Sequence, residues 1–428
     1  MNLSRRSILS GAAVSAVPAL PVLAAANKSQ IKDLQAALEK AIQGGGTIQL
    51  PAGRFSVSGL TITAPVHISG VPGGTILSSG NGKPVLTIDG AADVTISGIT
   101  FEGGDAPPAD DFSLVAAKGA TGLVIDSCRF TASKGNGLRL EGCAGRISGN
   151  YFADIARTAL FARDSQGLEI SGNSLDGIGN NGIQVWTSKP AEDGTMVSNN
   201  RISRVAANDG GTGQNGNGIN VYKAGNVMVS GNRISDCAFS AIRNNAGSNC
   251  QIQNNSISRT GEVAIYCEFG FEGAIVSGNL IEDVALGISI TNFNERGRLA
   301  TVANNVIRKV KGGGTLPDTS GVGIGAEADT VVTGNVIEEA ADTGISLGWG
   351  TYSRNLAASG NLLRNCRRGI VFSMTEGAEP VQIVNNRISG SADGSIIGAD
   401  YGEPRTTDLG LAGAAVLPGV MISGNLVN

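Results

Sequence analysis

Short runs in which apolar and polar residues alternate recur along most of the chain. In Ile219/Val221, Ile288/Ile290 and Ile345/Leu347 every second position is aliphatic and the residue between is polar. Side chains that alternate in this way point to opposite faces of a β-strand. Turn residues separate the runs. The pattern therefore predicts many short strands, each with one buried face.

A second pattern sets the spacing of these strands. An apolar run, a small residue and then asparagine recur, as in Ile147-Ser148-Gly149-Asn150. The asparagine slot is filled by Asn150, Asn173, Asn200, Asn232, Asn255, Asn279, Asn305, Asn335, Asn361, Asn386 and Asn425, at spacings of 23 to 39 residues. Cys128 fills the slot one period earlier. Each period also has a Gly-Ile or similar landmark, at Leu138, Leu160, Ile183, Ile219, Ile242, Ile265, Ile288, Ile324, Ile345, Ile370 and Ile396.

A repeat of this length is typical of a solenoid. Three short strands in each period, with turns between them and no helical pattern, predict an all-β parallel β-helix over residues 47–428. We expect the slot asparagines to take the left-handed conformation of a tight turn. We also expect their side chains to hydrogen-bond from coil to coil as a ladder.

Two segments precede the repeats. Ile31, Leu34, Leu38 and Ile42 form an amphipathic stripe that ends at Gly44-Gly45-Gly46, which predicts a capping helix within residues 27–46. Such a helix would cover the open edge of the first coil. Residues 1–26 combine Arg5-Arg6, an apolar stretch and a small-residue end at Ala26, which predicts a cleaved twin-arginine signal peptide. The mature protein would then be exported folded by the twin-arginine machinery to the periplasm or beyond, with no membrane span.

The cap and the repeats resemble a known superfamily. The segment from Leu34 through Gly44-Gly45-Gly46-Thr47-Ile48 to Phe55 resembles the N-terminal cap of pectin-lyase-like proteins, and the repeats resemble their right-handed β-helix coils. Together with the twin-arginine motif, they look like a family of exported β-helix repeat proteins of uncharacterised function. Phe269–Gly273 and Thr291–Leu299 are similar to that family as well. The resemblance implies the fold. It leaves function open, because the superfamily holds lyases, hydrolases, epimerases and non-catalytic proteins.

Composition narrows the function classes. Glycine accounts for 63 of 428 residues, about twice the usual share, which fits two or three turns per coil. A net charge of −4 gives no basic footprint for nucleic acid. Hydrophobic residues make up 41% of the chain, too many for a disordered protein. The six cysteines lack a framework spacing and lie in or beside apolar strands, which favours buried thiols, although one or two disulfides remain open.

Familiar catalytic and metal signatures are missing from the sequence. The only histidine, His67, falls in an early strand, so the Gly-His-Gly of galacturonases and the Asp-Pro-His-Asp of mannuronan epimerases are absent. We expect no metal site and no evident cofactor. Glu102, Asp105, Asp110 and Asp111 are a weak candidate for calcium, and a solvated loop explains them better. Gly211–Gly216 spells GxGxxG but leads into a strand instead of a helix, so we interpret it as a loop.

Loop lengths suggest where a ligand would bind. Slot and landmark are 9 or 10 residues apart in nearly every period, but 19 apart at Asn200–Ile219 and at Asn305–Ile324. The insertions Val205–Asn217 and Val310–Val322 therefore border the Gly-Ile strands. In the superfamily, the outer face of this sheet usually holds substrate. Alternation places candidate polysaccharide-binding residues there, namely Gln184, Trp186, Asn220, Asn245, Ser289 and Thr291.

The same face offers candidate catalytic residues. For a β-elimination or epimerisation, Arg243 would neutralise a carboxylate, and Tyr222, Lys223 or Tyr266 would act as the base, with Glu268 beside them. Hydrolysis would need Glu268 and Glu327, two coils apart. The sequence thus favours an exported β-helix that binds a polysaccharide or cell-envelope glycan, as a lyase or epimerase. The alternative is a non-catalytic glycan-binding or structural protein, with a solvated Arg243–Glu268 pair on that face.

Overall fold

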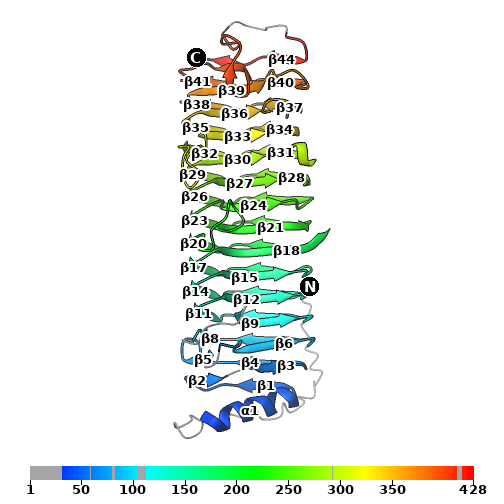
Figure 1. Ribbon diagram of the computed structural model, residues 1–428, viewed down its shortest axis with the longest axis vertical. Coiled ribbons are helices and arrows are strands. Elements are labelled where there is room, and N and C mark those ends of the chain that lie inside the picture. The colour runs from blue at the N-terminus through cyan, green and yellow to red at the C-terminus, as the bar shows by residue number, and fades with distance from the viewer. Residues whose placement is uncertain (1–30, 58, 80–81, 105–111, 292, 412–416) are drawn as a thin grey trace, which may run out of the picture.

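A single stack of coils runs the length of the molecule (Figure 1). The computed structural model describes residues 31–428, except residues 58, 80–81, 105–111, 292 and 412–416. Each coil has three short strands, and strands of successive coils pair to form three sheets of fifteen, here called A, B and C. Every pairing between coils that involves described strands is parallel; β43 pairs antiparallel with its neighbour β42. The predicted parallel β-helix is confirmed.

Sheet A is the first sheet that each coil visits. Its strands are β1 (Gly46–Gln49), β4 (Val66–Ser69), β7 (Val94–Ser97), β10 (Leu123–Asp126), β13 (Gly145–Ser148), β16 (Glu169–Ser171), β19 (Met196–Ser198), β22 (Met228–Ser230), β25 (Cys250–Gln253), β28 (Glu272–Ser277), β31 (Arg298–Ala303), β34 (Ala328–Thr333), β37 (Arg354–Ser359), β40 (Val381–Val384) and β44 (Val420–Ser423). His67 points outward from β4.

Sheet B follows the asparagine slot. Its strands are β2 (Gly53–Val57), β5 (Thr75–Ser79), β8 (Ile99–Glu102), β11 (Arg129–Ser133), β14 (Tyr151–Ile155), β17 (Ser174–Ile178), β20 (Arg201–Val205), β23 (Arg233–Cys237), β26 (Ser256–Thr260), β29 (Leu280–Val284), β32 (Val306–Val310), β35 (Val336–Ala340), β38 (Leu362–Arg364), β41 (Arg387–Ser389) and β45 (Leu426–Val427).

Sheet C contains the Gly-Ile strands. Its strands are β3 (Leu60–Ile62), β6 (Leu86–Asp89), β9 (Ser113–Lys118), β12 (Asn136–Glu141), β15 (Thr158–Arg163), β18 (Asn181–Glu192), β21 (Asn217–Gly225), β24 (Ile242–Asn245), β27 (Val263–Glu268), β30 (Leu286–Ile290), β33 (Val322–Ala326), β36 (Thr343–Leu347), β39 (Arg368–Ser373), β42 (Ile396–Asp400) and β43 (Glu403–Pro404). A short 3-10 helix, η2 (Phe293–Glu295), follows β30.

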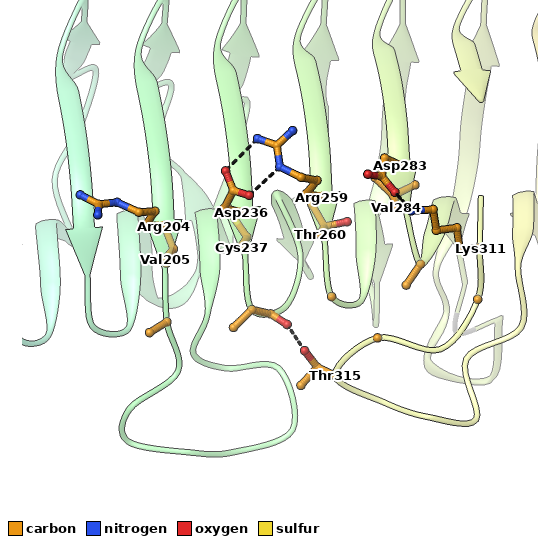
Figure 2. Close-up of a pocket in the computed structure, with 16 residues that line it drawn as sticks. Arg204, Val205, Asp236, Cys237, Arg259, Thr260, Asp283, Val284, Lys311 and Thr315 are labelled. Carbon is orange, nitrogen blue, oxygen red and sulfur yellow. Dashed lines mark hydrogen bonds and ion pairs between the residues drawn. The ribbon is translucent and has the colours of Figure 1, made fainter. Parts of the chain in front are cut away.

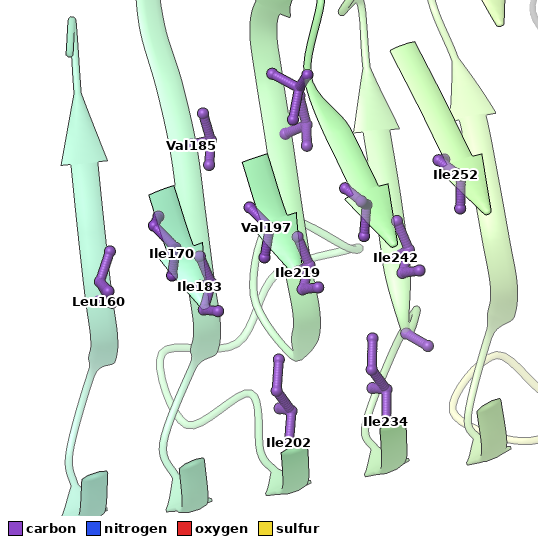
Figure 3. Close-up of a cluster of buried hydrophobic side chains, with 14 of the residues drawn as sticks. Leu160, Ile170, Ile183, Val185, Val197, Ile202, Ile219, Ile234, Ile242 and Ile252 are labelled. Carbon is purple, nitrogen blue, oxygen red and sulfur yellow. The ribbon is translucent and has the colours of Figure 1, made fainter. Parts of the chain in front are cut away.

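The core consists of aliphatic columns that run along the stack (Figure 3). Leu160, Ile183, Ile219 and Ile242 are in register in four neighbouring coils, and all four are buried. The same register joins every landmark from Leu138 to Ile396. Burying one face of each strand against the other two sheets removes these side chains from water, which is the main favourable contribution to folding.

Both ends of the stack are covered. Helix α1 (Ile31–Gly44) lies across the first coil, where Leu38 and Ile42 are buried in the core (Figure 1). At the other end, the described residues 401–411 follow β42, and Leu409 packs into the core. The Asp408 carboxylate there accepts the N–H of Ser395 at 2.8 Å. None of the described helices is long and apolar enough to cross a membrane. The predicted signal peptide lies outside the described residues.

The asparagine slot forms a continuous buried ladder. Asn255 Nδ2 donates to Asn279 Oδ1 at 3.0 Å and to the carbonyl of Val229 at 3.0 Å. Asn255 Oδ1 in turn accepts from the backbone N–H and from Nδ2 of Asn232, both at 3.0 Å. The pattern repeats at each slot from Asn150 to Asn386, and Cys128 joins through its N–H. The predicted ladder is confirmed.

The backbone of the slot was predicted wrongly. The slot asparagines are absent from the left-handed region, and the residue before each slot occupies it instead. Examples are Gly149 (φ 64°), Gly231 (φ 67°) and Asn254 (φ 57°). The corner therefore needs glycine or asparagine one position earlier, because these residues tolerate a positive φ. The slot residue is asparagine because its amide both donates and accepts along the ladder.

All six cysteines are buried free thiols, as the sequence favours. Burial raises the pKa of Cys237 to about 12, and the pKa of Cys267 also rises to about 12 for the same reason. These thiols are therefore core side chains instead of nucleophiles or disulfide partners.

An acidic side chain joins three coils on sheet A. Asp329 accepts from Arg354 Nη2 at 2.6 Å, Asn355 Nδ2 at 2.9 Å and Arg298 Nε at 3.0 Å. The hydrogen bond from Arg354 is the main cause that lowers the pKa of Asp329 to about 2. A lowered carboxyl pKa stabilises the fold above the unfolded pKa, near 3.9, and this contribution is lost as the pH falls through the folded pKa.

We therefore expect the thermal midpoint of Asp329→Asn to depend less on pH in the acidic range than that of the wild type. Asparagine accepts the positive φ at this position, so the backbone is preserved. The thermal midpoint of the wild type should fall more steeply than that of Asp329→Asn between about pH 4 and pH 2. Asp318→Asn, on an exposed loop, is the control and should follow the wild type. Parallel curves for wild type and Asp329→Asn would contradict the prediction.

Candidate functional site

A groove of about 370 Å³ lies on the outer face of sheet C, where loop 206–216 folds over the strands. Strands β18, β21 and β24 form its floor. Loop 206–216 forms one wall, and Phe269, the residue after β27, forms the other. The lining residues are Gln184, Trp186, Thr212, Gly213, Gln214, Asn220, Tyr222, Arg243, Asn245 and Phe269. Six of these are sequence-predicted residues. Alternation brought them to one face, since β18, β21 and β24 are paired in register.

An aromatic row forms one side of the floor. Trp186 and Tyr222 are register partners in β18 and β21, and their ring centroids are 5.0 Å apart at 75°. The ring centroid of Phe161, in the preceding coil, lies 5.6 Å from that of Trp186. The indole remains 37% exposed, although indoles are usually well buried. An accessible indole of this kind is a surface on which the face of a sugar ring can pack.

Amide side chains form the other side of the floor. Asn245 Nδ2 donates to Glu268 Oε1 at 2.7 Å, and Gln184 Oε1 accepts from Thr158 Oγ1 at 3.0 Å. Asn220 is buried, and its Oδ1 atom has no partner among the described residues. A buried acceptor without a partner is costly in a folded protein. A ligand hydroxyl at this place would remove that cost.

Arg243 lies at the end of the floor in a buried charge cluster. Nε donates to Glu268 Oε1 at 2.6 Å and Nη2 to Glu268 Oε2 at 2.9 Å. Nη1 donates to Glu262 Oε2 at 3.2 Å and to the carbonyl of Gly213 at 2.9 Å. Arg243 is 8% exposed and Glu268 2%. The alternative of a solvated Arg243–Glu268 pair is therefore wrong: the pair exists, but it is buried, and loop 206–216 contacts Arg243.

The cluster has no positive charge to spare for a ligand. Burial acts to lower the pKa of Arg243, but the hydrogen bonds and charge of Glu268 raise it by more, so the guanidinium stays charged. Burial also raises the pKa of Glu262. Two carboxylates face one guanidinium, and all three of its nitrogens already donate hydrogen bonds within the protein.

Tyr266 lies beside this cluster, with Arg243 Cζ 5.0 Å from its ring centroid. Burial, and then the charge of Glu268, raises the pKa of the Tyr266 phenol well above its usual value. The phenol is therefore protonated near neutral pH, which opposes the role of general base that the sequence suggested.

The remaining predicted residues lie around the groove and do not line it. The Lys223 ammonium is 4.7 Å from the Tyr222 ring centroid. Ser289 is the register partner of Tyr266 in the next coil. Thr291 Oγ1 donates to Glu327 Oε1 at 2.6 Å, and Glu327 also accepts the N–H of Phe293 at 2.7 Å.

Five residues of the site were missed by the sequence analysis. Thr212, Gly213 and Gln214 were interpreted only as loop residues, although the nine-residue insertion before Ile219 was the available signal. Phe269 was noted only because the segment Phe269–Gly273 resembles the exported β-helix repeat family. Glu262 gave no signal, because it lies just before the strand β27 and the alternation that marks an outer face does not extend to it.

Comparison with known proteins identifies the family. The family model described as "Right handed beta helix region" matches residues 66–202 and 191–321, together more than half of the chain. The chain belongs to the right-handed β-helix family. No curated protein matched the chain.

Several solved structures share this right-handed β-helix. A PL6 alginate lyase in complex with a trisaccharide is 15% identical with a TM-score of 0.55, over 81% of this chain and 83% of the lyase. PfbA, a surface adhesin of Streptococcus pneumoniae, is 14% identical with a TM-score of 0.52, over 92% of this chain and 96% of the adhesin. A mannuronic acid specific family 6 lyase from human gut microbiota is 13% identical with a TM-score of 0.50, over 90% and 91%. At these identities the likeness establishes the fold.

A larger depression of about 820 Å³ lies on this β-helix at the corner between sheets B and C, between loop 206–216 and loop 311–321 (Figure 2). Its charged side chains are paired, as in the contact of Arg259 Nε with Asp236 Oδ1 at 2.6 Å. Small residues such as Ala238 and Ala285 make up much of its lining. Among the described lining residues there is no aromatic ring, so the groove on sheet C has the richer chemistry for recognition.

The candidate calcium loop lies mostly outside the described residues, which exclude Asp105, Asp110 and Asp111. Glu102 is described and accepts from Arg54 Nη1 at 2.8 Å. Within the described part of the β-helix, no group of three or more His, Cys, Asp or Glu residues is arranged to hold a metal ion.

Proposed function

We propose that this β-helix binds a neutral polysaccharide in the groove on sheet C. The observation that carries the proposal is the combination of an accessible Trp186–Tyr222 pair with the amides of Gln184, Asn220 and Asn245. Aromatic faces pack on sugar rings and amides pair with sugar hydroxyls. Arg243 is the one charged residue among the described groove residues, and two carboxylates already compensate it. Arg243 therefore has no charge to spare for a polyuronate.

The structural neighbours support a carbohydrate role. One is an alginate lyase in complex with a trisaccharide, and another is a surface adhesin, so the same fold serves both catalysis and attachment. Export by the twin-arginine route, proposed from Arg5-Arg6 and the apolar stretch that follows, would bring the protein to cell-envelope or external glycans.

A lyase or epimerase acting on an acidic glycan is the second candidate. The observation that favours it is the guanidinium of Arg243 next to the phenol of Tyr266, since a cation and a base are what removal of a C5 proton requires. Glu268 would orient Arg243, and Tyr222 or Lys223 would be the other candidate base. Binding without turnover fits better, because Arg243 is engaged by Glu268 and Glu262 and because Tyr266 is held protonated.

Trp186→Ala tests the proposal. It should raise the Kd for a neutral glycan about tenfold, or about 1.4 kcal/mol, because it removes the aromatic platform. The measurement is calorimetric titration with the best neutral ligand from a glycan array. The control is Tyr151→Ala, an aromatic residue on sheet B, which should bind like the wild type.

The same preparations should be assayed on neutral and acidic polysaccharides for unsaturated ends and for reducing sugar. No turnover is expected. Unsaturated products from a polyuronate that disappear in Tyr266→Phe would establish the lyase candidate instead. Equal affinities of Trp186→Ala and wild type would show that the groove is not the binding site.

A further inference from the structure

Six of the seven tryptophan and tyrosine residues lie in two groups, both bordering the outer face of sheet C. In the first group, Trp186 and Tyr222 line the groove and Tyr266 lies beside Arg243 at its end. The second group, Trp349, Tyr352 and Tyr401, lies several coils further along, beside β36 and β42. The repeat pattern does not predict the second group, because its members lie in a turn after β36 and in the segment after β42.

A tight turn presents the rings of the second group. Trp349 and Tyr352 exchange backbone hydrogen bonds of 3.0 Å across a two-residue turn. The Trp349 and Tyr401 ring centroids are 6.1 Å apart at 84°. Gly350 (φ 57°) makes this approach feasible, since a Cβ atom there would lie 2.1 Å from the Tyr401 ring. Tyr401 itself has a φ of 45°, an uncommon conformation for an aromatic residue.

These rings border a pocket of about 80 Å³, here called the distal pocket, whose lining includes Trp349, Tyr401, Arg368, Ser346 and Ser320. Arg368 is 9% exposed. Its Nη2 donates to Asp342 Oδ1 at 2.6 Å and its Nη1 to the carbonyl of Gly402 at 2.9 Å, while Nε has no partner among the described residues. The pocket therefore combines two rings with a buried donor that the protein does not satisfy.

A purely structural role for the rings is less consistent with their exposure. Val371 and Ile397 form a small apolar cluster on the outer face of this end of sheet C, and they are already buried. Trp349 is instead 50% exposed and Tyr401 51%.

A lane of small residues connects the two pockets. Along the row that continues from Tyr266, the register partners in the next three coils are Ser289, Gly325 and Ser346. A Cβ atom at Gly325 would have nothing within 4 Å, so the surface above it is open. Tyr222 lies in β21, and Trp349 follows β36. Five inter-strand steps separate these two strands, which is about 24 Å.

We propose that the distal pocket is a second saccharide-binding subsite, and that one glycan chain lies along the lane from the groove to the distal pocket. The ligand class, a neutral glycan, rests on the proposed function, whereas the existence of the subsite rests on the distal pocket itself. Two sites that engage one chain make the second contact intramolecular, so long chains should bind more tightly than short ones.

The chain has two tryptophans, one at each site, so fluorescence can report them separately. Trp349→Phe leaves Trp186 as the reporter of the groove, and Trp186→Phe leaves Trp349 as the reporter of the distal pocket. Both proteins would be titrated with a neutral polysaccharide that binds on a glycan array and with short oligosaccharides of the same linkage. We expect the polysaccharide to change the emission of both reporters.

A third variant tests the lane. Gly325→Gln places a long side chain in open space at a position without a positive φ, so the fold should tolerate it. Introduced alone into the wild-type protein, it should raise the Kd for the polysaccharide about tenfold or more. The Kd for short oligosaccharides should stay at the wild-type value.

The outcomes separate the two proposals. If the emission of Trp186 changes and that of Trp349 does not at saturating polysaccharide, the proposal of a distal subsite is wrong and the proposal of binding in the groove is supported. If Trp349 alone responds, the distal subsite stands and the groove is wrong. If neither responds to any neutral polysaccharide, both are wrong. If both respond but Gly325→Gln changes nothing, the sites bind separate chains and the lane is wrong.

Discussion

Arg243→Met is expected to lower the free energy of unfolding by about 3–5 kcal/mol near neutral pH. The substitution removes the cation that faces Glu268 and Glu262, and both carboxylates stay buried. An unpaired buried carboxylate binds a proton more readily, so its folded pKa rises above its unfolded value. The variant should therefore regain stability relative to the wild type as the pH falls, and lose it as the pH rises.

Denaturant midpoints at several pH values measure this effect. The matched control is Arg259→Met, which breaks an exposed bidentate pair with Asp236 and should cost less than about 1 kcal/mol. Combining Arg243→Met with Glu262→Gln and Glu268→Gln should restore much of the loss, since no buried charge remains. If Arg243→Met costs no more than Arg259→Met, the buried cluster does not exist as described.

Asn255→Ala is expected to cost about 2–5 kcal/mol. Asn255 is a middle rung of the ladder, and its removal leaves the buried N–H of Asn232 without its acceptor and removes the side-chain hydrogen bonds to Val229 and Asn279. Each unsatisfied buried group costs about 1–3 kcal/mol. In a repeat protein the damage is greatest in the neighbouring coils, because each coil contacts only its neighbours.

Two measurements check the ladder. The denaturant midpoint should fall for Asn255→Ala and stay near the wild-type value for Ser256→Ala, the exposed next residue. Hydrogen exchange of the Asn232 amide should become much faster in Asn255→Ala, while amides in the distant coil of Asn386 keep their protection. Equal midpoints for the two variants would contradict the role assigned to the ladder.

The coil architecture was predictable because its causes are local. The landmark residues alternate with polar residues, and the asparagine slot marks one corner of each coil, so strand positions and facing follow from the sequence. Leu138 to Ile396 indeed form one column. The left-handed residue was misplaced by one position, because glycine and asparagine both tolerate positive φ and neighbouring positions compete for the turn.

The site was predictable only in part, because alternation shows which face a side chain occupies but not what covers it. Trp186 and Tyr222 were expected on the outer face and lie there. Arg243 was expected there too, but the carbonyl of Gly213 in loop 206–216 accepts from its guanidinium, and Glu262 of the next coil contacts it as well. Trp349 and Tyr401 come together through contacts outside the repeat, and no periodic pattern encodes such contacts.

The central claim is that the groove binds an uncharged glycan, and one titration tests it most directly. Trp349→Phe protein, whose remaining indole is Trp186, would be titrated with a neutral glucan and with the same glucan oxidised to carry carboxylates. The proposal predicts saturable change in Trp186 emission with the neutral polymer and at least tenfold weaker binding of the oxidised one at the same ionic strength. Tighter binding of the oxidised polymer, or no change with the neutral one, would contradict it.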